Sequence, residues 1–167
     1  MAKFTLTHTI NCGADKCAKL YSDPAFNEAL YKQRFGYSAF TVASRTETDA
    51  QIACAYTGKN LSRTLAAPAR AQTGDIAYKD SFVFDKAKQS GQAKLTPLAS
   101  PEKFLLQASV SITPVGDSQV NLVREYLVEA KVFGIGGLLE GEFEKLLREE
   151  AEAGAALLNE WIAQGKA

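Results

Sequence analysis

The chain has 167 residues, of which 46% are hydrophobic and 23% are charged, and its 19 basic residues balance 19 acidic ones. This neutral balance argues against a protein held on nucleic acid by a broad cationic field, because such affinity comes mainly from phosphate neutralisation. The length fits a single domain over residues 1–167 better than two, and a chain of this size needs no disulfide or metal staple to form a core.

The N-terminal part predicts one strand and two short helices. Residues 3–10 alternate apolar and polar side chains, which favours a strand and excludes the continuous apolar core of a secretory signal. A first short helix is expected over residues 14–21. The second begins at Asp23, a good N-cap that precedes Pro24, and ends at Gly36.

A long β region follows the helices. The candidate strands span residues 37–46, 51–57, 75–84, 91–97, 103–113 and 119–133. Short turns join most of them, as at residues 114–118, and strands joined in this way form an antiparallel sheet. The segment 58–74 carries Lys59, Arg63 and Arg70 without an acid, and we expect it to be an irregular edge strand or a flap that gates entry to the interior.

The C-terminal part predicts one long helix. Residues 138–164 contain no proline, and apolar side chains recur among them at helical spacing. The acidic residues of this segment, Glu149 and Glu150 among them, are expected on its solvated face. Residues 134–137 are rich in glycine but lack the GxGxxG pattern and the lysine of a phosphate-binding loop, so we expect no cofactor. No apolar run reaches about eighteen residues, which predicts no transmembrane segment but leaves transient membrane contact open.

The cysteines are few and irregularly spaced. Cys12, Cys17 and Cys54 are odd in number, which indicates a reducing cytoplasm rather than a disulfide framework. A closed zinc site usually needs four Cys or His ligands, and the chain has only one histidine, His8. We therefore expect no metal.

The order of these elements resembles the START-like, or helix-grip, superfamily (also called SRPBCC), which includes the polyketide cyclase and birch-pollen-allergen-type proteins. The segments AKFTLTHTINC, DPAFNEALY and VEAKVFGIGGLLEGEFEKLLREE are similar to a bacterial family of unknown function within it. The resemblance implies an α+β fold, in which a curved antiparallel sheet of about seven strands and two short helices surround the long C-terminal helix and leave a cavity against it. Such proteins often carry a large apolar residue where this chain has Cys17 and Ala18.

Reading each strand with period two gives a candidate inner face that is mostly apolar and aromatic. The titratable exceptions are His8, Asp80 and Arg124. Arg124 has three interpretations: an anchor for a carboxylate or phosphate, an ion-pair partner of Asp80 at the cavity rim, or an outward-facing residue if the strand register is shifted by one. The candidate ligand-binding residues are Phe40, Tyr56, Tyr78, Asp80, Phe82, Phe104, Arg124, Tyr126, Leu139, Phe143, Leu147 and Trp161.

Three functions fit this interpretation. The first is binding of a hydrophobic or amphipathic small molecule, lipid-like or polyketide-like, in a cavity of about 300 Å³ or more. The second is an enzyme of cyclase or hydratase type that uses the same cavity, with His8 or Tyr126 as acid–base and Arg124 at a developing oxyanion. The third is a protein-interaction module whose cavity is vestigial. No nucleophile–base–orienter set is visible, so we assign no catalytic residue.

Overall fold

The computed structural model describes residues 1–59, 67 and 76–166. The predicted flap at 58–74 therefore lies almost wholly outside the described residues. The strands are β1 (Ala2–Ile10), β2 (Ala39–Glu47), β3 (Gln51–Lys59), β4 (Ala77–Asp85), β5 (Ser90–Pro97), β6 (Phe104–Pro114) and β7 (Val120–Ala130). The helices are α1 (Ala14–Tyr21), α2 (Pro24–Glu28), the π-helix η1 (Ala29–Arg34), the short 3₁₀ helix η3 (Pro101–Lys103) and α4 (Gly136–Ala163).

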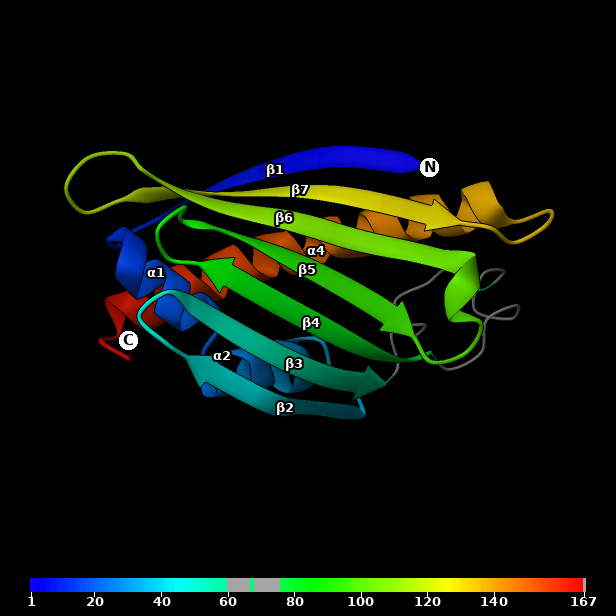
Figure 1. Ribbon diagram of the computed structural model, residues 1–167, viewed down its shortest axis with the longest axis horizontal. Coiled ribbons are helices and arrows are strands. Elements are labelled where there is room, and N and C mark those ends of the chain that lie inside the picture. The colour runs from blue at the N-terminus through cyan, green and yellow to red at the C-terminus, as the bar shows by residue number, and fades with distance from the viewer. Residues whose placement is uncertain (60–66, 68–75, 167) are drawn as a thin grey trace.

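The seven strands form one antiparallel sheet in the order β1-β7-β6-β5-β4-β3-β2 (Figure 1). This confirms the predicted α+β helix-grip class, and it places the first and last strands side by side. In their register Leu6 faces Arg124 and His8 faces Leu122. The period-two pattern also holds, because the inner positions of β3, Ile52, Cys54 and Tyr56, are buried.

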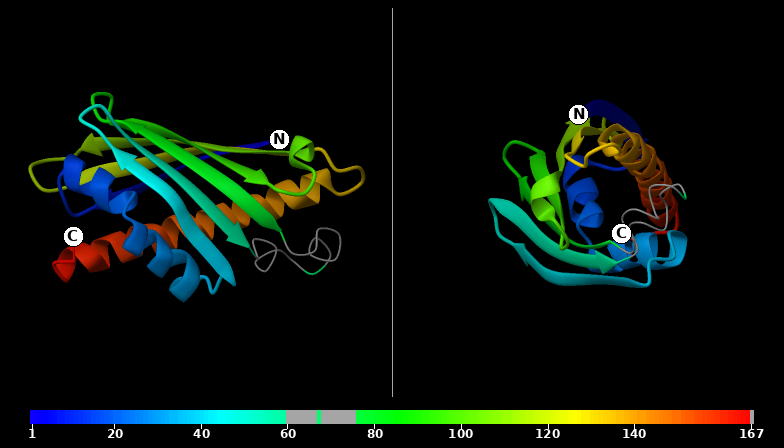
Figure 2. Two further views of the ribbon diagram at one scale, coloured as in Figure 1. Left: turned by 60° about the horizontal axis from the view of Figure 1, so that its bottom comes forward. Right: turned by 90° about the vertical axis from the view of Figure 1, so that its right-hand side faces the viewer.

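The sheet curves so that α4 lies along its concave side. The end-on view in Figure 2 shows the sheet bending from β1, beside α4, round to β2. The α4 helix contacts β1 and β7, whereas α2 and η1 contact β2, and η1 also touches α4. These short helices therefore close the gap between the free edge of the sheet and the long helix.

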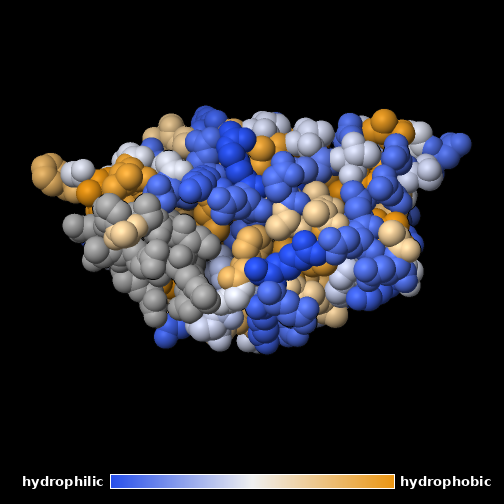
Figure 3. Space-filling view, turned by 180° about the vertical axis from the view of Figure 1, so that it is seen from behind, coloured by the Kyte–Doolittle hydropathy of each residue, from blue (hydrophilic) through white to orange (hydrophobic). Residues whose placement is uncertain are grey.

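The face of the molecule on the α4 side carries both hydrophilic and apolar side chains. From the α4 side, hydrophilic side chains separate the apolar surface into patches (Figure 3). The exposed large apolar residues of the described part are Met1, Val83, Leu98, Val115, Phe133 and Leu138. No helix in this part is both long enough and apolar enough to cross a bilayer.

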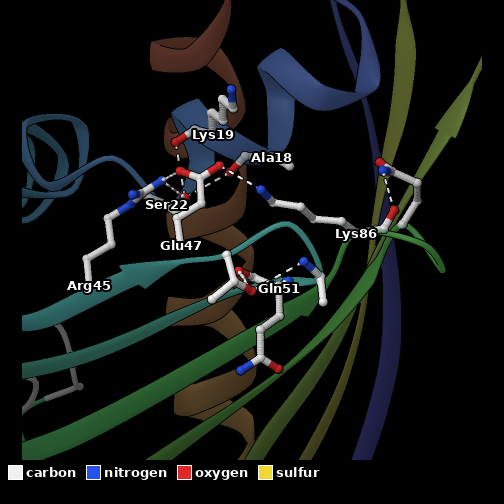
Figure 4. A network of polar contacts seen from close by, with 10 residues as sticks. Ala18, Lys19, Ser22, Arg45, Glu47, Gln51 and Lys86 are labelled. Atoms are coloured by element: carbon white, nitrogen blue, oxygen red, sulfur yellow. Dashed lines mark hydrogen bonds and ion pairs between the residues drawn. The ribbon is translucent and has the colours of Figure 1, made fainter.

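A polar network joins the α1–α2 junction to the end of the sheet (Figure 4). The register of β2 shifts between Val42 and Ser44, and this bulge brings Arg45 opposite the inward-facing Cys54. Arg45 then donates to the carbonyl oxygen of Ser22 at 3.1 Å and to its Oγ at 3.3 Å. Ser22 is fully buried, so the network ties the short helices to the sheet.

A carboxylate on the surface completes this network. Glu47 accepts hydrogen bonds from Arg45 at 3.0 Å and from Lys86 at 2.8 Å. These two bonds lower the pKa of Glu47 from its ordinary 4.5 to about 2. Glu47 therefore stays ionised near neutral pH, and its carboxylate holds the Arg45 guanidinium that bonds to Ser22.

Candidate functional site

A cavity lies between the concave face of the sheet, the η1 helix and α4. Its volume is about 120 Å³, which is less than the 300 Å³ or more that we expected. Aromatic rings form much of its wall. The lining residues are Tyr21, Asn27, Tyr31, Phe40, Tyr56, Tyr78, Asp80, Phe82, Ala93, Leu95, Leu106, Gln107, Ala108, Tyr126, Phe143, Leu146, Leu147 and Glu150.

Eight of the twelve candidate residues predicted from the sequence line this cavity. They are Phe40, Tyr56, Tyr78, Asp80, Phe82, Tyr126, Phe143 and Leu147. The inward positions of β3 and β4 supply four of them, because Tyr56 pairs with Asp80 across these strands and the alternation continues on both sides. The alternation of inner and outer side chains along each strand therefore predicted most of these wall residues correctly.

The other four residues lie elsewhere. Phe104 and the fully buried Leu139 belong to the core beneath the start of α4, where Phe104 packs edge-on against Phe143 at 6.0 Å. Trp161 packs edge-on against Phe26, near the other end of α4. Arg124 is on the inner face, but Tyr21 and His8 lie against its guanidinium, and it does not line the cavity.

Glu150 corrects the expectation that the acidic residues of the last helix are all solvated. It lines the cavity together with Phe143 and Leu147. The sequence carried this signal, because positions 143, 147 and 150 follow the spacing of one helix face, and an acid within an apolar stripe has no solvated place. The more strongly exposed Glu149 behaves as predicted.

The π-helix η1 places Tyr31 in the wall. The wide turn is visible in the bond from the Phe35 amide to the Leu30 carbonyl, and the Tyr37 amide donates to the Tyr31 carbonyl. The ring of Tyr31 stacks on Phe40 at 4.6 Å. Short π-helical turns occur frequently at functional sites. The sequence predicted a single ordinary helix here with Tyr31 on its apolar side, but Tyr31 was not among the candidate ligand-binding residues.

Asp80 is the most unusual group in the wall. Its Oδ1 is buried and has no hydrogen-bond partner among the described residues. Burial raises the pKa of Asp80 from its ordinary 3.8 to about 7, and a backbone hydrogen bond from Ser81 opposes the rise only in part. Buried polar atoms are normally paired, so this oxygen is available to a ligand.

Glu150 faces the same cavity from α4. The Tyr37 hydroxyl donates to its Oε1 at 3.0 Å. Burial nevertheless raises the pKa of Glu150 from 4.5 to about 7, and the charge of Asp80 adds to the rise, whereas Tyr37 and Arg124 oppose it. Two carboxyl groups that titrate near neutral pH thus share one cavity.

The tyrosines of the wall are neutral donors. Burial raises the pKa of Tyr31, Tyr56, Tyr78 and Tyr126 above the ordinary value of 10. Their hydroxyl groups therefore keep their protons at neutral pH. The wall combines aromatic faces with a small number of placed polar atoms, which is the usual composition of a small-molecule site.

Arg124 has no carboxylate within ion-pair distance among the described residues, so the alternative of an Asp80–Arg124 pair is wrong. Its Nη1 lies 3.2 Å from Nδ1 of His8, and Nε2 of His8 lies 3.2 Å from Glu152. Arginine only donates, so Nδ1 must accept and the proton of a neutral His8 is on Nε2. His8 and Arg124, two titratable side chains of the predicted inner face, therefore contact each other.

The described residues offer no other reactive cluster. No group of three or more His, Cys, Asp or Glu side chains within them is arranged to hold a metal ion. Cys12, Cys17 and Cys54 are free and buried. Burial raises the pKa of the Cys17 thiol to about 12, so its thiolate, the form that attacks or binds a metal, is disfavoured.

Solved structures with the same fold extend over nearly the whole chain. The protein TTHA0849 from Thermus thermophilus matches with a TM-score of 0.68 and 14% identity, over 99% of this chain and all of that one. The Zhui aromatase/cyclase from Streptomyces sp. R1128 matches with a TM-score of 0.64 and 9% identity, over 95% of this chain and 91% of that one. A START superfamily protein from Mycobacterium smegmatis matches with a TM-score of 0.58 and 16% identity, over 95% and 97% of the two chains.

These identities are low, and the likeness shows a shared fold. No curated protein matches the chain in sequence. A family model does match, over residues 5–162, and it is described as "Protein of unknown function (DUF2505)". The match includes most of β1, the other six strands and almost all of α4, and the fold is that of the START superfamily. The chain therefore belongs to the DUF2505 family.

Proposed function

We propose that the protein binds a small, largely apolar molecule in the cavity between its sheet and α4. The observation that carries this proposal is the cavity wall itself, which combines aromatic rings with an unpartnered buried oxygen on Asp80. An unpaired polar atom destabilises a buried site, so its presence in the wall is better explained by a ligand that bonds to it than by packing alone. The fold supports the proposal, since the structural relatives include a protein named an aromatase/cyclase.

The cavity volume sets the size of the ligand. A cavity of about 150 Å³ lined by apolar side chains is known to bind benzene, so about 120 Å³ limits the enclosed part of the ligand to about one aromatic ring. This favours a compact aromatic ligand over a long-chain lipid. The free, buried thiols of Cys12, Cys17 and Cys54 support a reducing compartment such as the cytoplasm.

The test is binding of 2-phenylethanol, followed by ligand-observed NMR, in the wild-type protein and in a variant with a filled cavity. Ala93→Leu places a larger side chain in the wall, and Ala43→Leu makes the same change at an exposed position of β2. We expect saturable binding in the wild type and in Ala43→Leu, and its loss in Ala93→Leu. Equal binding by all three proteins, or by none, would overturn the proposal.

A second function, acid–base catalysis in the same cavity, is favoured by one observation. Asp80 and Glu150 both have a pKa of about 7, and a catalytic acid or base works best near the operating pH. Asp80 and Glu150 thus take the acid–base role for which the sequence had suggested His8 or Tyr126. The test is deuterium exchange next to the carbonyl of phenylacetone, which we expect the wild type to accelerate and Asp80→Asn not to accelerate. Wild-type exchange at the buffer rate would remove this candidate.

A further inference from the structure

The charged side chains among the described residues of the cavity wall are all acidic. Asp80 and Glu150 line it, whereas none of its described lining residues is a lysine, an arginine or a histidine. Buried charges are normally paired, because an isolated ion loses its hydration without compensation. Among the described residues, the wall therefore holds no positive group to pair with these two carboxylates.

The nearest buried cation is already engaged. Arg124, which is 3% exposed, directs Nη1 to His8, and its guanidinium lies 5.4 Å from the centre of the Tyr21 ring. Tyr21 itself is part of the cavity wall, and the arginine packs against this ring without lining the cavity. An anionic head group would therefore be repelled by Asp80 and Glu150. No guanidinium among the described lining residues would offset that repulsion.

The rings of the wall suit a cation. The Tyr31, Phe40 and Tyr56 rings follow one another as a stack, with centroid separations of 4.6 and 5.8 Å. The faces of the middle ring are covered in this stack, so the ring quadrupole attracts a cation at an outer face, within about 6 Å of the ring centre. Carboxylates and aromatic faces together therefore recognise an ammonium group attached to an apolar body.

We propose that the ligand is a small apolar amine, whose ammonium group binds between Asp80 and Glu150 and whose body packs on the rings of the wall. This inference rests on the proposed function and adds the chemical class of the ligand. The unpartnered Oδ1 of Asp80 accepts one hydrogen bond from the ammonium. Glu150 keeps its bond from Tyr37 and offers its other oxygen.

Binding of an amine is then linked to proton release. At neutral pH the two carboxyls of the empty cavity hold about one proton between them, since each has a pKa of about 7. An ammonium favours their ionised forms and expels that proton. The other titratable or charged groups that act on this pair are Tyr31, Tyr37, Cys54, Tyr56, Tyr78, Arg124 and Tyr126. Of these, the thiol and the phenols remain protonated and Arg124 remains charged over the range from about pH 6 to 8.

The experiment compares three probes of one size by isothermal titration calorimetry at about pH 8: 2-phenylethylamine, 2-phenylethanol and phenylacetate. We expect the amine to bind at least about tenfold more tightly than the alcohol, as for a hydrogen bond to a charged group, and phenylacetate to bind worst. At about pH 7, the dependence of the measured enthalpy on the buffer should report release of up to about one proton per bound amine.

Matched variants locate the effect. Asp80→Asn should abolish the preference for the amine, measured as the ratio of the affinities for 2-phenylethylamine and 2-phenylethanol. Asp85→Asn makes the same change at the end of the same strand, at a side chain that is 44% exposed, and should retain the preference. On α4, Glu150→Gln is the second test variant, and the exposed Glu149→Gln is its matched control, which should retain the preference.

The outcomes separate the two proposals. Binding of 2-phenylethanol with no preference for the amine, or a preference for phenylacetate, would overturn the amine inference and leave the cavity as a binding site. Persistence of the preference in both Asp80→Asn and Glu150→Gln would also overturn it. Failure of all three probes to bind would overturn the proposed function itself, together with the inference.

Discussion

Replacement of Asp80 by Asn should make the protein more stable at about pH 8. The wild-type carboxyl has a pKa of about 7 in the folded protein, against 3.8 ordinarily, because the fold buries it without compensation. Between these two values the unfolded chain has lost its proton and the folded chain retains it. Stability attributable to Asp80 is therefore fully present below about pH 4 and is lost as the pH rises through about 7.

The magnitude follows from the two pKa values. Each pKa unit corresponds to about 1.4 kcal/mol, so a rise from 3.8 to about 7 corresponds to about 4 kcal/mol of lost stability above pH 7. Asparagine has nearly the same shape and carries no charge, so Asp80→Asn should remove this loss. The variant should match the wild type near pH 4 and exceed it by about 4 kcal/mol at about pH 8.

Urea denaturation of both proteins at about pH 4, 6 and 8 measures the difference. Asp85→Asn is the matched control, because it removes an acid at the exposed end of the same strand. The control should follow the wild type at every pH. A stability of Asp80→Asn that falls with pH as steeply as that of the wild type would refute the reasoning.

Two further predictions concern single hydrogen bonds. Tyr37→Phe removes the donor to Glu150, so the pKa of Glu150 should rise above about 7; carboxyl-detected ¹³C NMR titration measures it, and an unchanged value would show that this bond is not formed in solution. Ser22→Ala removes the buried Oγ that accepts from Arg45 and leaves the bond from Arg45 to the Ser22 carbonyl oxygen. It should lower the free energy of unfolding by about 1–2 kcal/mol, whereas the exposed Ser44→Ala should change it little; equal effects of the two in urea denaturation would contradict the network's role.

The sheet and most of the cavity wall could be predicted from the sequence because both depend on local alternation. Period two alone placed Tyr78, Asp80 and Phe82 correctly on the inner face of β4. Alternation also placed Arg124 on the inner face, yet it carries no information on what stands between that side chain and the cavity. The position of Tyr21 against the guanidinium depends on how α1 packs, which is a tertiary property.

Other features had weaker signals or none. Glu150 was visible in principle as an acid within an apolar helical stripe, but the number of surrounding acids concealed it. The bulge in β2 that turns Arg45 inward and the π-helix that turns Tyr31 inward both insert one residue into a regular period. The cavity volume depends on how every side chain of the wall packs, so no sequence pattern predicted that it would be about 120 Å³.

Intermolecular NOEs from bound 2-phenylethanol test most directly whether the ligand lies between the sheet and α4. We predict NOEs to the methyl groups of Ala93, Ala108 and Leu147, which come from two strands and the long helix and line one cavity. NOEs confined to the recess at the surface beside Trp161 and Ala25 would place the ligand outside the interior and contradict this assignment.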